Sequence, residues 1–96
     1  MIVEFEDQGS GDVHVKKTGE KLGTYAYELV RFREDDSGLS DSELSIDFDL
    51  LTAHRCLGSG EKLVLQIQDG RHIDFYVSSI DEEAIGLRPT GALYTT

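Results

Sequence analysis

Apolar and polar side chains alternate along most of this chain, and the clearest alternation lies in residues 43–50. Four apolar residues there point one way, and four acidic or hydroxyl residues point the other way. The apolar set is Leu44, Ile46, Phe48 and Leu50, and the polar set is Glu43, Ser45, Asp47 and Asp49. Because side chains on a β-strand point to opposite faces in turn, this period of two predicts a strand with one buried face.

Two further strands are predicted near the start of the chain, over residues 2–7 and 12–17. In both, valine or phenylalanine alternates with a charged or histidine side chain. The polar run Gln8-Gly9-Ser10 between them predicts a short hairpin loop. Pairing Phe5 with Val13 would keep the apolar residues of both strands on one face.

Residues 24–33 are rich in aromatic and branched side chains and predict another strand. The apolar face of this strand changes midway, because Tyr27 and Leu29 lie on one face while Val30 and Phe32 lie on the other. Such a change predicts either a β-bulge or burial on both faces.

The best-specified hairpin surrounds the Asp69-Gly70 pair, which separates two runs of alternating apolar residues. A two-residue turn would place the two apolar rows on opposite faces of the sheet, which is costly when one face is buried. A three-residue loop, Gln68-Asp69-Gly70, with its glycine in the left-handed conformation instead pairs Leu65 with Ile73. The sequence therefore predicts the three-residue loop.

The remaining segments are less regular. Residues 34–42 form a polar, charged stretch that we expect to be a loop. After Phe48 the chain either continues as a strand or turns into a short helix near 50–57. In the helical alternative Asp49 caps the start, Gly58 ends the helix, and one face holds Leu50, Ala53, His54 and Leu57. Turns at 81–83 and 89–91 then flank a last short strand that contains Ile85 and Leu87.

Short strands separated by tight turns predict a mainly β protein. We expect a small antiparallel barrel or sandwich of about seven short strands, with at most one helix, near 50–57. A chain of 96 residues suits one core, so we expect residues 1–96 to form a single domain. The apolar faces predict this core: Leu44, Ile46, Phe48, Leu63, Leu65, Ile67, Ile73, Phe75, Val77, Ile85 and Leu87.

The segment 57–87 resembles the first motif of Sm-like small barrels. The shared features are a strand led by leucine, the sequence Asp69-Gly70-Arg71, and Ser79 and Asp81 before the next strand. The resemblance implies barrel-like geometry. Phe75 stands where that family typically has glycine, and no asparagine follows Asp81 as a base-contacting residue. The resemblance therefore implies no function and no site residue.

Charge is distributed unevenly along the chain. The formal net charge is −10, and residues 34–50 hold seven acids and no base. Nucleic acids bind to lysine and arginine through their phosphate backbones, and a chain with this excess of acids would repel the phosphates. Direct nucleic-acid binding is therefore disfavoured. The same charge favours a basic protein as the partner.

The compartment is predicted from what the chain lacks. No apolar run approaches the length of a membrane span, and the first residues lack the basic start of a secretory signal. We therefore expect a cytoplasmic protein with no membrane contact. The single cysteine, Cys56, is expected to be a small buried apolar residue. Monomer and homodimer both remain open.

No stretch of the chain carries a catalytic signature, so we expect no enzyme activity, no metal and no cofactor. His54, Cys56 and His72 lack the spacing of zinc ligands, and Gly58-Ser59-Gly60 is not followed by the Lys-Ser or Lys-Thr of a phosphate loop. The pair Asp47 and Asp49 is more typical of a solvated or partner-binding strand face than of an acid–base or cation site.

Two functions remain as hypotheses. In the first, the chain is a non-enzymatic acidic interaction module that binds a basic protein, in the role of an inhibitor, an immunity-like protein or a mimic of nucleic acid. Its contact residues would be Asp35, Asp36, Asp41, Glu43, Asp47 and Asp49. In the second, a small β-barrel binds a ligand or RNA through the aromatic and arginine side chains of one strand. These are Tyr25, Tyr27, Arg31 and Arg33.

Overall fold

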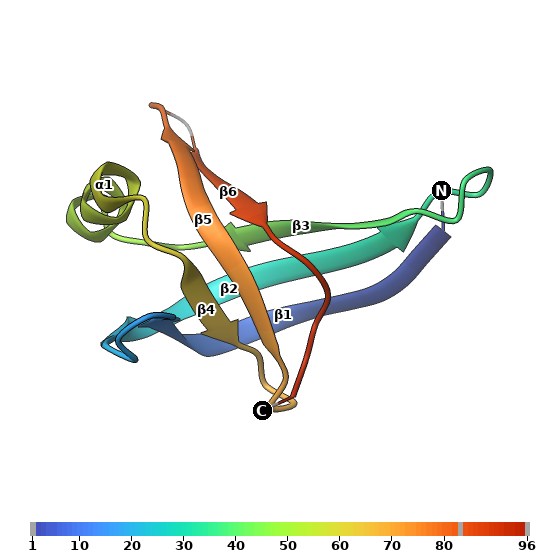
Figure 1. Ribbon diagram of the computed structural model, residues 1–96, viewed down its shortest axis with the longest axis horizontal. Helices are drawn as coiled ribbons and strands as arrows, with labels where there is room; N and C mark the ends of the chain where they lie inside the picture. Colours follow the sequence, from blue (N-terminus) through green and yellow to red (C-terminus); the bar gives the residue numbers. More distant parts are fainter. Residues whose placement is uncertain (1, 83, 96) are drawn as a thin grey trace.

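The computed structural model describes residues 2–82 and 84–95, which form six strands and one helix (Figure 1). The strands are β1 (Ile2–Val15), β2 (Lys21–Arg33), β3 (Ser40–Ile46), β4 (Leu63–Gln66), β5 (His72–Ile80) and β6 (Ile85–Pro89), and the helix is α1 (Leu50–Ser59). Neighbouring strands are antiparallel, in the order β3-β2-β1-β4-β5-β6. The edge strands β3 and β6 pack against each other, so the sheet curls into a nearly closed barrel.

This architecture confirms the predicted mainly β antiparallel fold, and of the two alternatives, barrel and sandwich, it is barrel-like, with fewer and longer strands than expected. Figure 1 shows β4, β5 and β6 crossing over one end of β1, β2 and β3. The other ends of the long strands project beyond the crossing as an arm, formed by residues 2–6, 30–33 and 40–43. We call the face toward the barrel core the inner face and the opposite one the outer face.

The hairpin predicted at residues 8–10 is wrong, because β1 runs through this segment as one strand of 14 residues. Gly9 and Gly11 lie within β1 at points where groups of neighbouring segments approach the backbone closely. A Cβ atom on Gly11 would lie 2.3 Å from the backbone oxygen of Gln66 and 3.3 Å from the ring of Tyr27. Any side chain at position 11 would therefore push the strands apart.

The change of apolar face in β2 coincides with a bulge, as predicted, but the bulge lies in β1. Val3 pairs with Phe32 and Phe5 pairs with Arg31, so Glu4 is the extra residue. Val3 and Phe32 consequently share the outer face, while Phe5 lies on the inner face and packs against the core.

The hairpin of β4 and β5 has the predicted register. Leu65 pairs with Ile73 and Leu63 pairs with Phe75. Gly70 has a φ of 92°, the left-handed conformation that the three-residue loop requires. Both apolar rows therefore face the core.

The chain turns into a helix after Phe48, so Leu50 begins α1 and does not continue the strand. Asp49 is the N-cap, because its carboxylate accepts a hydrogen bond from Thr52 N at 3.0 Å. The helix ends at Gly60, whose φ of 66° is left-handed, and not at Gly58 as predicted.

The buried face of α1 also differs from the predicted one. Ala53 and Cys56 are buried, which confirms the expectation for the cysteine, whereas Leu50 and Leu57 are exposed. Because α1 lies close against β5, small side chains fit between them and leucines do not.

The connection between β2 and β3 is shorter than the loop predicted for 34–42. Glu34 N donates to Leu39 O at 2.8 Å, and Gly38 N donates to Glu34 O at 3.1 Å. These bonds close a tight turn, so β3 begins at Ser40.

Most of the predicted core is confirmed. The predicted residues that are buried are Leu44, Ile46, Phe48, Leu63, Leu65, Ile67, Ile73, Phe75 and Val77. Ile85 and Leu87 are only partly buried, although they pack against this core. The core also contains residues absent from the predicted set: Val13, Val15, Tyr27, Leu29, Ala53 and Cys56.

Gly11→Ala should destabilise the protein by about 1–3 kcal/mol, because the added methyl group overlaps the backbone of Gln66. Gly58→Ala is the matched control: Gly58 lies within α1, and nothing lies within 4 Å of the added methyl group. It should stabilise the helix by up to about 1 kcal/mol. Urea denaturation measures both changes, and equal stability of the two variants would contradict the close approach at Gly11.

Candidate functional site

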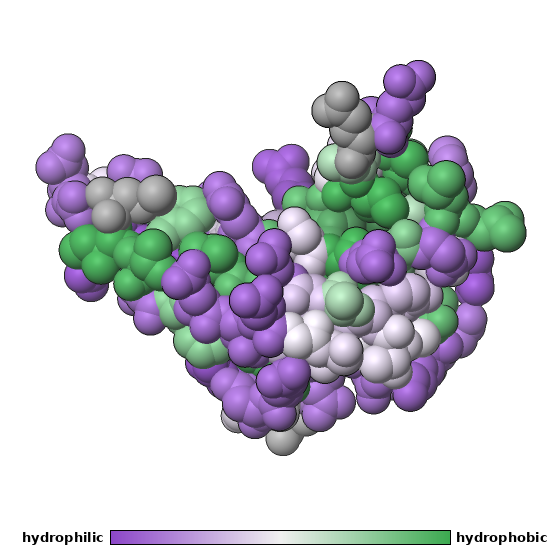
Figure 2. All heavy atoms as spheres, turned by 180° about the vertical axis from the view of Figure 1, so that it is seen from behind, coloured by the Kyte–Doolittle hydropathy of each residue, from purple (hydrophilic) through white to green (hydrophobic). Residues whose placement is uncertain are grey.

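The outer face of β1, β2 and β3 is acidic. The strand register places every second residue of these strands on that face. From residue 3 to 10, from 26 to 32 and from 41 to 47, every charged side chain at an outward position is an acid. These acids are Glu6, Glu28, Asp41, Glu43 and Asp47. Figure 2 shows this face, where hydrophilic residues separate two apolar areas at its ends.

The arginines of β2 lie on the opposite face. Arg31 Nη1 donates to Ser42 Oγ at 3.0 Å, and Arg33 pairs with Ser40. Both arginines therefore point to the inner side of the arm. The alternation of the strand separates them from the acids, so they do not neutralise the outer face.

A groove of about 800 Å³ lies on this acidic face. Its floor comes from β1, β2 and β3, and its walls come from Leu50 at the start of α1 and from the β5–β6 turn. Carboxylates line it on several sides: Glu28, Asp47, Asp81 and Glu82. No lysine, arginine or histidine lines it in the part of the chain that the structure describes. A concave surface lined by one sign of charge concentrates the opposite charge.

The acids predicted as partner contacts lie in different environments. Asp41, Glu43 and Asp47 are on the outer face, and Asp47 also lines the groove. Asp35 and Asp36 lie in the β2–β3 turn at the end of the arm.

Asp49 is engaged in the structure of α1. Its carboxylate accepts hydrogen bonds from both Thr52 N and Thr52 Oγ1, at 3.0 and 2.9 Å. The bond from Thr52 N is the main reason why the pKa of Asp49 lies below its ordinary value. This carboxylate therefore stabilises the helix start.

Three acids of the groove were not among the predicted contact residues: Glu28, Asp81 and Glu82. Glu28 lies at an outward position of the strand predicted for residues 24–33, so its exposure on the outer face could have been predicted. Nothing in the sequence indicates that Asp81 and Glu82 lie near the end of β3.

The residues predicted as an alternative ligand face lie on the inner side of β2. Tyr27 is buried, and its hydroxyl donates to Asp7 Oδ2 at 2.5 Å and accepts from Gln68 N at 3.1 Å. Burial, and then the bond to Asp7, raise the pKa of Tyr27 to about 12. The Tyr25 ring packs on Phe48 with 4.8 Å between centroids. Both tyrosines thus serve the core, and the Tyr27 ring is closed to a ligand.

Lys62 and Arg88 flank Tyr76 on the outer face of the other half of the barrel, and Lys16 lies beside Lys62. Lys16 N donates to Lys62 O at 2.9 Å, and Lys62 Nζ lies 5.7 Å from the centroid of the Tyr76 ring. Tyr76 pairs with Arg88 across β5 and β6. We call these four residues the basic row. The basic row could not be predicted from the sequence, because its members come from four separate segments.

Asp74 is a buried carboxylate beside the basic row. Lys16 Nζ donates to Asp74 Oδ2 at 2.7 Å, and the Tyr94 hydroxyl donates to Asp74 Oδ1 at 2.5 Å. Burial by itself would raise the pKa of Asp74, but these two donors outweigh it and hold the pKa below its ordinary value. The Tyr94 ring also stacks on His72, so this network ties residues near the C-terminus to β5.

The residues considered as metal ligands or nucleophiles are dispersed. Cys56 is buried, and burial raises the pKa of its thiol. His54 is exposed on α1, and His72 stacks on Tyr94. Within residues 2–82 and 84–95, no group of three histidine, cysteine or acidic side chains is placed to hold a metal ion.

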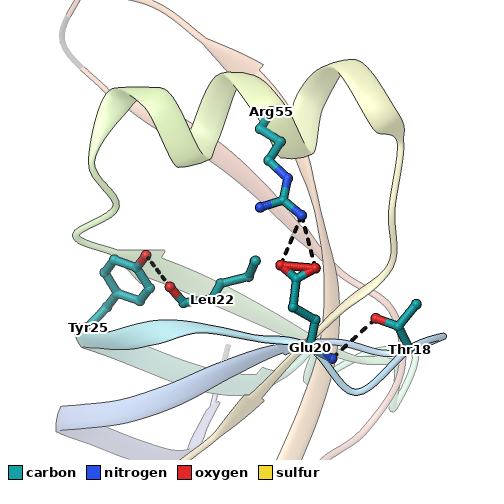
Figure 3. A network of polar contacts seen from close by, with 5 residues as sticks. All are labelled: Thr18, Glu20, Leu22, Tyr25 and Arg55. Carbon is teal, nitrogen blue, oxygen red and sulfur yellow. Dashed lines mark hydrogen bonds and ion pairs between the residues drawn. The ribbon is translucent and has the colours of Figure 1, made fainter.

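An ion pair joins α1 to the turn between β1 and β2 (Figure 3). Arg55 Nη2 donates to both carboxylate oxygens of Glu20, at 3.1 and 3.0 Å. Beside it, Glu20 N donates to Thr18 Oγ1 at 3.2 Å. One side of α1 is therefore held toward this turn.

Asp74→Asn should remove a pH-dependent contribution to stability. A carboxylate with a lowered pKa in the folded state stabilises the fold above its unfolded pKa of about 3.9, and this contribution is lost as the pH falls through the folded value. The stability difference between wild type and D74N should be larger at neutral pH than at about pH 3. Urea denaturation at both pH values measures it, with Asp36→Asn as the exposed control. A difference that does not change with pH would contradict the assignment.

Comparison of this chain with protein-family models, with curated proteins and with solved structures gave no match. No helix in the described part of the chain is long and apolar enough to span a membrane. The interpretation of the acidic face and the basic row therefore depends on their own geometry.

Proposed function

We propose that this protein is a non-enzymatic interaction module that binds a basic protein through the acidic outer face of β1, β2 and β3. The observation that carries this proposal is the groove, which acids line on several sides and which no base lines among the described residues. A cationic side chain that enters it meets the carboxylates of Glu28 on β2, of Asp47 just after β3, and of the β5–β6 turn together.

The strands give these charges a fixed arrangement. Glu28 and Asp47 are held by regular pairing or by backbone bonds to neighbouring strands, so they lose little conformational freedom when a partner binds. A face of one charge also accelerates the approach of an oppositely charged partner, an effect that salt screens. Binding by this face should therefore be fast at low salt and weaken steeply as salt rises.

Decalysine is a suitable probe, measured by calorimetry at low and moderate salt. The variant E28Q/D47N/E82Q removes three groove charges at exposed positions, so the fold should survive. We expect binding to weaken by about tenfold at low salt, equivalent to about 1.4 kcal/mol. The matched control E34Q/D36N/E61Q removes three charges that do not line the groove and should weaken binding much less. Equal losses in the two variants would show only a general effect of net charge, and the proposal would fail.

The basic row supports a second candidate function. Tyr76 lies between Lys62 and Arg88, and cations around an aromatic ring can bind a phosphate backbone while a base stacks on the ring. As the second candidate, we propose that the basic row binds a single-stranded nucleic acid or a related anionic aromatic ligand. The net charge of −10 opposes the binding of a nucleic acid, so binding of a basic protein by the acidic face remains the first proposal.

Fluorescence anisotropy with labelled decauridine tests the second candidate. Tyr76→Ala should weaken binding by about 5- to 150-fold, since stacking on one aromatic ring contributes about 1–3 kcal/mol. Tyr25→Ala is the control, because that ring lies on the inner side of β2 and packs on Phe48, and circular dichroism checks that this variant is folded. Undetectable binding of the wild type at low salt would exclude this function.

A further inference from the structure

The helix α1 exposes a row of leucines that no other part of the described chain covers. Leu51 is 85% exposed, Leu50 is 61% exposed and Leu57 is 37% exposed. Leu57 follows Leu50 by seven positions, so Leu50 and Leu57 lie on one side of the helix, about 10 Å apart along its axis. Large apolar side chains grouped at a surface mark interaction sites more often than isolated ones do.

The orientation of α1 is fixed, so these leucines do not simply belong to a loosely attached helix. Ala53 and Cys56 are buried on one side. Arg55 is held by Glu20, as Figure 3 shows. Asp49 and Gly60 cap the two ends. The leucines therefore lie on the part of the helix surface that makes none of these contacts and faces solvent.

The leucine face continues into the acidic groove. Leu50 lines the groove together with Asp47 and Ile85. Figure 2 shows an apolar area at this end of the outer face, next to hydrophilic residues. Apolar and negatively charged surfaces are thus adjacent, and a single partner segment can contact both.

We infer that the leucine face of α1 and the acidic groove bind a basic amphipathic helix of a protein partner. This inference rests on the proposed function and names the kind of segment that the acidic face recognises. Leucines or other apolar residues of the partner would pack on Leu50, Leu51 and Leu57. Lysines or arginines on the flank of the same helix would reach the carboxylates of the groove.

A helix fits this surface better than a strand does. Leu50 and Leu57 lie on one side of α1 two turns apart, and Leu51 lies about 100° further round the helix. Side chains spaced in this way can pack into the grooves between the side chains of a second helix. Strand addition needs a free sheet edge. β3 and β6 pack against each other, and β1 pairs with β4 only from Asp12 onward, so the free edge lies along the earlier part of β1 and not at the leucines of α1.

Charge selects the partner. A second copy of this chain would bring another net charge of −10 to the interface, and the acids beside α1 would repel their counterparts. A cationic helix instead gains attraction from Asp47, Asp81 and Glu82 while it covers the leucines.

The test uses three labelled peptides and fluorescence anisotropy. The first is a leucine–lysine peptide of about 18 residues with leucines at helical spacing, the second has the same composition with leucine and lysine alternating, and the third contains only lysine at equal charge. Each peptide is titrated with the wild type and with L50S/L51S. The matched control is I2S/L39S, because Ile2 and Leu39 are also exposed but lie at the end of the arm.

We expect the helical peptide to bind the wild type at least about tenfold more tightly than the two other peptides. L50S/L51S should abolish this advantage and leave the binding of the lysine peptide unchanged, whereas I2S/L39S should retain the advantage. Circular dichroism confirms that both variants are folded.

Other outcomes separate the two proposals. If all three peptides bind equally well and L50S/L51S has no effect, the proposal that the acidic face binds basic proteins stands. The inference that the partner segment is an amphipathic helix is then overturned. If no peptide binds, the proposed function fails as well. If the wild type sediments as a dimer and L50S/L51S as a monomer, a second copy covers the leucines and the inference is wrong.

Discussion

Strand β1 is the element through which both halves of the barrel are joined into one sheet. It pairs with β2 over most of its length and with β4 through Asp12–Val15. Val13 illustrates the consequence, since it lies between a residue of β2 and Leu65 of β4 and is fully buried. At Gly11 the groups around β1 approach too closely for a side chain. The register of β1 therefore aligns β2 and β3 on one side with β4, β5 and β6 on the other.

The same alternation that builds the core also sorts the charges. Residues of one strand face inward and outward in turn, so Arg31 and Glu28 end on opposite faces of β2 although they are near in sequence. On the other half of the barrel the outward positions hold Lys62 and Arg88. A chain with a net charge of −10 thus presents an acidic face and a smaller basic one. This separation, and not the total charge, is the basis for proposing a specific partner.

The helix α1 adds an apolar component to the acidic face. Its small residues Ala53 and Cys56 pack close to β5, and this close packing leaves no room for the leucines on the inner side. Exposed leucines interact unfavourably with water, so a partner that covers them gains free energy from their burial. Leu50 belongs to both the leucine face and the groove, which is why one amphipathic segment can satisfy both surfaces.

Features that depend on neighbours in sequence could be predicted from the sequence. The β4–β5 hairpin is one example, because a three-residue loop ending in Gly70 and two alternating rows allow a single register. The N-cap at Asp49 is another, since it needs only Thr52 three residues later. The outward position of Asp47 followed in the same way from the alternation around it.

Features that depend on distant segments were decided by the tertiary structure. Gly9 and Ser10 have the local composition of a turn, and only the neighbours of β1 in the folded sheet keep them in a strand. The buried side of α1 was likewise set by β5, which lies later in the chain. The groove combines acids of β2 and β3 with those of the β5–β6 turn, and the basic row combines four segments. Local propensity acts over a few residues, whereas these surfaces exist only once the sheet has curled and brought its ends together.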